Sequence, residues 1–111
     1  MMTDREMLEL AAKAAGIEHL SSEYYVSGPE LWDIERKRWW RPLTNDGDSL
    51  RLAVQLGLIV CVMNGAHFTG IYISSESPCG KYDEVEHHGE CALAATRRAI
   101  VRAAAQIGAQ L

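Results

Sequence analysis

Several features that define large classes of proteins are missing from this sequence. No apolar run approaches the roughly 20 residues that a membrane-spanning helix needs, and the first residues are acidic and amphipathic, unlike a secretion signal. The three cysteines are odd in number, and Cys61 falls within an expected buried strand, so a disulfide framework is not expected. We therefore expect a cytoplasmic protein that makes no membrane contact.

An excess of basic residues is also absent. The formal net charge of −4 at pH 7 argues against a protein that wraps nucleic acid over its whole surface, although a local basic patch stays open. The contents of 48% hydrophobic and 23% charged residues are typical of a folded globular chain, not of a disordered one. A length of 111 residues suits one domain, which we expect to span residues 1–111.

The sequence contains capping residues that mark the beginning and end of two expected helices. Thr3 and Glu6 form a capping box, which predicts a helix over residues 4–15 that Gly16 ends. Later, Pro42 excludes a helix through its position, and Asn45, Asp46 and Asp48 can cap a helix that starts near residue 46 and stops at Gly57. The apolar residues of this second helix cover a broad arc, so we expect it to be largely buried; they are Leu50, Leu52, Ala53, Val54 and Leu56.

The remaining pattern predicts four strands and a third helix. Strands are expected near residues 23–26, 30–34, 58–63 and 68–74, followed by a polar loop over residues 75–89 and a helix over residues 90–107. The order α-β-β-α-β-β-α predicts an α+β fold in which about four mainly antiparallel strands form one sheet packed by three helices.

The stretch from residue 40 to residue 58 also carries a family resemblance. It reads WRPLTNDGDSLRLAVQLGL and resembles the WNPLTDDGDALRLAVKL-type segment of small proteins encoded by phages and prophages. These are described as phage α/β/α-sandwich domains related to the NinX-like phage accessory proteins. The Ala- and Arg-rich stretch at residues 92–105 resembles the C-terminal helix of that family. The resemblance implies a three-layer α/β/α sandwich and an accessory protein in the host cytoplasm, and it implies no settled activity.

Cysteine and histidine gather near the last expected helix, at Cys79, His87, His88 and Cys91. These are zinc-ligand types, but their spacing lacks the short paired clip of common structural zinc sites. Cys79 with either histidine as a base is the enzymatic alternative, yet a Pro-Cys-Gly turn is a poor place to preorganise a nucleophile. We therefore expect a polar loop, no metal, no other cofactor and no catalytic residue.

The candidate binding surface lies in and next to the only basic run, residues 36–41, which also contains two tryptophans. Four of the eleven Lys and Arg residues fall there, and Tyr24 and Tyr25 lie just upstream. Each large aromatic ring occupies roughly 150–250 Å² when buried, so this small domain is not expected to bury them all. The surface comprises Trp32, Arg36, Arg38, Trp39, Trp40 and Arg41.

Trp, Tyr and Arg dominate the energetics of protein interfaces. We therefore expect a protein that acts by binding, to a partner protein or to itself as a homo-oligomer, through this surface. Single-stranded nucleic acid is the alternative, because bases stack on aromatic rings beside basic groups. A small enzyme acting on a nucleotide or another small molecule is the third hypothesis, and it requires a concave pocket with convergent polar groups.

Overall fold

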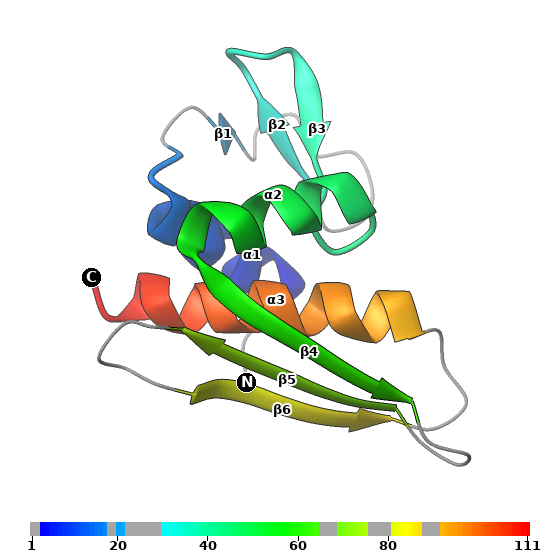
Figure 1. The fold of residues 1–111 in the computed structure, drawn as a ribbon. Coiled ribbons are helices and arrows are strands. Elements are labelled where there is room, and N and C mark those ends of the chain that lie inside the picture. The colour runs from blue at the N-terminus through cyan, green and yellow to red at the C-terminus, as the bar shows by residue number, and fades with distance from the viewer. Residues whose placement is uncertain (1–2, 18–19, 22–29, 65–68, 76–80, 88–91) are drawn as a thin grey trace.

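The described part of the chain contains three helices and two small sheets, with helix α3 between the other helices and one of the sheets (Figure 1). The computed structural model describes residues 3–17, 20–21, 30–64, 69–75, 81–87 and 92–111. At residues 20–21, 61–64, 69–75, 81–87 and 92 it describes the backbone alone. Within these ranges, no helix combines the length and the apolar character required to span a bilayer.

Helix α1 runs over Asp4–Ala15, as the capping box predicts. The side chain of Thr3 accepts a hydrogen bond of 3.1 Å from the Glu6 backbone N–H, which satisfies one of the free donors of the first turn. Gly16 ends the helix at a φ of 72°, in the left-handed region that glycine adopts without strain.

Helix α3 spans Ala92–Ala109, two residues further along the chain than the pattern of apolar residues predicts at both ends. It packs along α1, and the two helices form most of the core (Figure 1). Small residues allow their backbones to come close: a Cβ placed on Gly108 would clash with the carbonyl oxygen of Leu10. The buried hydrophobic residues of α3 are Ala95, Ala99, Ile100, Val101, Ala103, Ala104 and Ala105.

Helix α2 covers Asp46–Leu56 and starts and stops as predicted, with Asn45 as its N-cap and Gly57 in the left-handed region. The expectation that it is largely buried is wrong. Leu52 and Ala53 lie in the core, whereas Leu50 and Val54 are 64% and 71% exposed. The helix packs mainly on α3, which covers only one side of it, so two apolar positions of the predicted arc remain in solvent.

Each of the two sheets has three antiparallel strands. The first consists of β1 (Leu20–Ser21), β2 (Leu31–Asp33) and β3 (Arg38–Trp40), in that order. The second consists of β4 (Leu58–Asn64), β5 (Thr69–Ser75) and β6 (Lys81–His87), and α3 lies across it (Figure 1).

The single sheet of about four strands, and with it the three-layer sandwich around one sheet, is therefore wrong. The described elements follow the order α-β-β-β-α-β-β-β-α, and the strands divide between two sheets that α2 separates along the chain. Three of the described strands, β1, β3 and β6, were not predicted. The charged run at residues 35–38, for which no strand was expected, forms a hairpin turn and the start of β3. The polar stretch assigned to a loop contains β6, an edge strand, where charged side chains are common. The strand expected at residues 23–26 lies outside the described residues.

Candidate functional site

The two faces of the β2–β3 hairpin carry different pairs of side chains. Trp32 lies opposite Trp39 across the strands, and their rings meet edge to face with centroids 5.1 Å apart and an interplanar angle of 73°. On the alternate positions, Leu31 lies opposite Trp40 and both are buried. The aromatic pair and the buried pair therefore occupy opposite faces, because successive side chains of a strand alternate.

Asp33 shapes the turn of the hairpin. Its side-chain Oδ1 accepts a hydrogen bond of 2.9 Å from the Arg36 backbone N–H, and its backbone oxygen accepts one of 2.8 Å from Lys37. Lys37 completes the turn at a φ of 57°, an uncommon conformation for a residue with a side chain. This turn brings Arg38 back across from Asp33.

Asp48, in the first turn of α2, is the centre of the site. Its side chain is 1% exposed, and its Oδ1 accepts hydrogen bonds from Nη2 of Arg38 at 2.5 Å and from Nη2 of Arg51 at 2.7 Å. The backbone N–H of Arg41 donates to its Oδ2 at 2.9 Å. The Asp48 backbone N–H donates to Oδ1 of the cap residue Asn45 at 2.9 Å. One buried carboxylate thus joins the hairpin, the connection after it and α2.

These donors determine the charge of Asp48. Burial on its own raises the pKa of the Asp48 carboxyl, but the hydrogen bonds from the Arg41 N–H and from Arg51, with the positive charges of Arg38 and Arg51, lower it below 3.8. Asp48 is therefore ionised at neutral pH, and its oxygens are engaged by three donors. Such a carboxylate holds its neighbours in place and is unsuited to transferring protons near pH 7.

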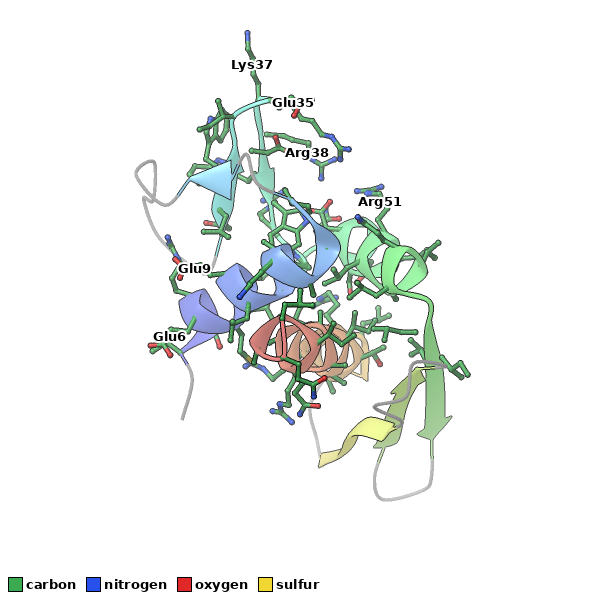
Figure 2. All side chains as sticks on the ribbon, turned by 90° about the vertical axis from the view of Figure 1, so that its left-hand side faces the viewer. Glu6, Glu9, Glu35, Lys37, Arg38 and Arg51 are labelled. Atoms are coloured by element: carbon green, nitrogen blue, oxygen red, sulfur yellow. The ribbon has the colours of Figure 1, made fainter. Side chains whose placement is uncertain are left out.

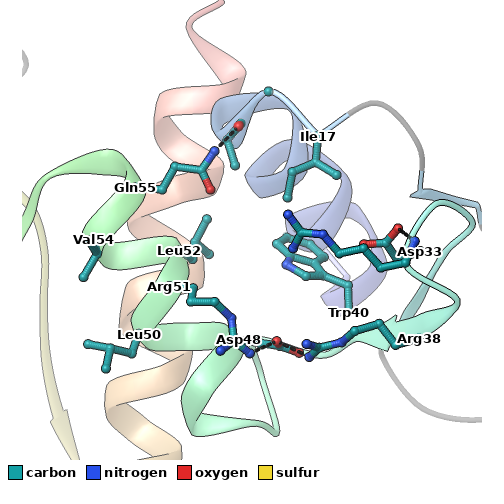
Figure 3. Close-up of a pocket in the computed structure, with 13 residues that line it drawn as sticks. Ile17, Asp33, Arg38, Trp40, Asp48, Leu50, Arg51, Leu52, Val54 and Gln55 are labelled. Carbon is teal, nitrogen blue, oxygen red and sulfur yellow. Dashed lines mark hydrogen bonds and ion pairs between the residues drawn. The ribbon is translucent and has the colours of Figure 1, made fainter.

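A cavity of about 560 Å³ lies beside this network, between the end of α1, the β2–β3 hairpin and α2 (Figure 3). Its charged lining consists of Arg36, Arg38 and Arg51 with Asp33 and Asp48. Its apolar lining consists of Ala15, Ile17, Trp40, Leu50, Leu52 and Val54. Gln55 closes one end, where its Nε2 donates to the carbonyl oxygen of Ala15 in α1. This volume falls in the range of small-molecule binding sites.

The structure separates the residues of the candidate binding surface. Arg36 and Arg38 line the cavity, and Trp40 forms part of its wall while remaining buried in the core. Trp32 and Trp39 are partly buried on the opposite face of the hairpin. The Arg41 side chain is exposed, and its backbone N–H donates a hydrogen bond to Asp48.

The sequence assigned Asp48 to helix capping only, and Arg51 was not among the predicted site residues. One signal could have linked them, since an Asp and an Arg three positions apart on a helix are neighbours. Figure 2 shows Arg38 and Arg51 on the same side of the molecule, away from Glu6 and Glu9 of α1.

The zinc candidates cannot be placed in this site. Cys79, His88 and Cys91 lie outside the described residues, and of His87 only the backbone is described, at the end of β6. Within the described part of the chain, no three His, Cys, Asp or Glu side chains gather as a metal site would require.

Comparison of the chain with protein-family models, with curated proteins and with solved structures found no match. The site is therefore interpreted from its own geometry.

Proposed function

We propose that this protein binds a partner protein through the cavity and the adjoining exposed side of α2, as an accessory protein of the phage type that its residues 40–58 resemble. The observation that carries the proposal is the composition of this surface. Guanidinium groups of Arg38 and Arg51 lie at a cavity that also includes Leu50 and Val54, two strongly exposed aliphatic side chains one helical turn apart. Arginine beside apolar groups is a combination that interfaces favour.

The arrangement of the tryptophans favours a protein over single-stranded nucleic acid. Bases need exposed rings next to basic groups on one surface. Here Trp40 is buried, and Trp32 and Trp39 pack against each other on the opposite face of the hairpin from Arg38.

Site-specific photo-crosslinking tests the proposal. A benzoylphenylalanine at Val54 is compared with one at Leu93, an exposed apolar residue that does not line the cavity. In host cells, Val54 should give an adduct of discrete mass that Leu93 does not give. The charge reversal Arg36→Glu should reduce this adduct about fivefold, which corresponds to about 1 kcal/mol of interface energy.

Arg36→Glu is a suitable variant because the hydrogen bond from Arg36 to Asp33 is donated by the Arg36 backbone N–H, which glutamate retains. Covalent dimers formed from Val54 in the purified protein, together with a dimer by sedimentation, would assign the surface to self-association. Equal labelling at Val54 and Leu93 would refute the proposed surface.

A further inference from the structure

Asp48 holds two exposed arginines side by side. Its own side chain is almost fully buried, whereas those of Arg38 and Arg51 are 43% and 58% exposed. Both arginines use a single Nη2 atom to bind the same carboxylate oxygen, one from the hairpin and one from α2 (Figure 3). Each guanidinium has five N–H donors, so most of the donors of this pair are not used by Asp48.

Among the described residues that line the cavity, the positive charges outnumber the negative ones. Three arginines (Arg36, Arg38 and Arg51) face two buried carboxylates (Asp33 and Asp48). The Oδ1 atoms of both carboxylates already accept hydrogen bonds within the protein, from the Arg36 backbone and from the arginine pair. Among the described residues, no carboxylate forms an ion pair with the Arg36 guanidinium. The excess of one positive charge contrasts with the net charge of −4 of the whole chain.

We propose that this cavity binds a carboxylate carried on a small aliphatic body. The unused N–H groups of Arg38 and Arg51 receive the carboxylate, because a guanidinium presents parallel donors that match its two oxygens. The aliphatic body contacts the apolar part of the cavity wall, which includes Ile17, Leu52 and Trp40. A monoanion matches the single excess charge, whereas a phosphate dianion would leave one negative charge uncompensated beside Asp33 and Asp48.

Two sources can supply this chemistry: a free small carboxylic acid, or an acidic residue next to an aliphatic one in the partner protein. The inference rests on the proposed function in the second case alone. In both cases the recognised group is the same, an ionised carboxylate attached to an apolar chain.

Nuclear magnetic resonance of the full chain tests the inference, because it detects weak binding and observes arginine side chains directly. The ¹⁵N-labelled protein is titrated with hexanoate, with hexanamide as the neutral compound of equal chain length, and with acetate as the head group alone. Hexanoate should shift the Nε–Hε signals of Arg38 and Arg51. It should bind at least about fivefold more tightly than hexanamide or acetate. Equal affinity for hexanoate and hexanamide would overturn the inference.

Variants locate the binding site. Arg51→Gln should weaken hexanoate binding about tenfold, since it removes one guanidinium of the pair. Arg98→Gln is the matched control, because Arg98 is about as exposed as Arg38 and pairs with Asp4 away from the cavity. If Arg51→Gln disturbs the spectrum of the fold, Arg36→Gln replaces it, with an expected loss of about threefold from the smaller charge excess. A loss of affinity in Arg98→Gln equal to that in the cavity variants would contradict the assignment.

A blocked Leu-Glu-Leu tripeptide distinguishes the two sources. Tighter binding of the tripeptide than of hexanoate assigns the site to an acidic segment of the partner, and the reverse order assigns it to a free acid. The outcome is separable from that of the photo-crosslinking. A discrete adduct at Val54 without hexanoate or tripeptide binding overturns the carboxylate site alone, and hexanoate binding without the adduct overturns the protein partner alone.

Discussion

Replacement of Asp48 by asparagine tests whether this carboxylate holds the site together. Asparagine keeps the shape of the side chain but replaces one of its two oxygens by an NH₂ group, which then faces either the arginine pair at Oδ1 or the Arg41 backbone N–H at Oδ2. A buried hydrogen-bond donor that has lost its acceptor lowers the free energy of unfolding by about 1–3 kcal/mol. The two lost ion pairs add about 0.5 kcal/mol each, since both arginines are half exposed and solvated. We expect a total destabilisation of about 3 kcal/mol.

The assay is urea denaturation at pH 7, supported by thermal unfolding. At about 4 °C per kcal/mol for a domain of this size, the expected loss corresponds to a fall of about 12 °C in Tm. Asp46→Asn is the matched control: Asp46 lies in the same turn of α2, but its side chain is mostly exposed and pairs with Arg97. This control should lose less than about 1 kcal/mol. An effect of Asp48→Asn no larger than that of Asp46→Asn would refute the central role of Asp48.

The pH dependence gives the same reasoning a second check. Because the folded pKa of Asp48 lies below 3.8, its carboxylate stabilises the fold fully above that pH, and this stabilisation is lost as the pH falls through the lower folded value. The difference in unfolding free energy between the native protein and Asp48→Asn should therefore be constant between pH 5 and 7 and should shrink at more acidic pH. A difference that grows on acidification would contradict the lowered pKa.

Three other substitutions probe the core and the hairpin. Ser49→Ala should leave stability unchanged or raise it by up to about 1 kcal/mol, because the buried Ser49 hydroxyl has no hydrogen-bond partner among the described residues; a loss in urea denaturation would contradict this. Gly108→Ala should destabilise by about 2 kcal/mol through its clash with Leu10, although alanine favours helices, and a higher Tm would show that the helices can separate at little cost. Trp40→Ala should cost about 3–5 kcal/mol and Trp39→Ala less than about 2 kcal/mol, since only Trp40 is buried; equal losses in circular dichroism melts would contradict that placement.

The helices were predictable because their end signals are local. A cap and the N–H group that it accepts lie three residues apart, as in Thr3 with Glu6 and Asn45 with Asp48, so the sequence alone contains both partners. The two sheets were not predictable in the same way. The short β3 strand exists because Asp33 turns the chain through a charged run, and β6 exists because β5 offers it a hydrogen-bonding edge. The pattern of hydrophobic residues predicts neither the turn at Asp33 nor the pairing of β6 with β5.

The amino-acid sequence by itself determined where the helices begin and end and which short stretch concentrates arginine and tryptophan, since both depend on residue types close together in the chain. Only the tertiary structure decided what those residues do. It buried Trp40, paired Trp32 with Trp39, and placed Arg38 and Arg51 on one oxygen of Asp48. The physical reason is that burial and ion pairing depend on distances in space, and the hairpin, not the sequence spacing, brings Arg38 to the first turn of α2.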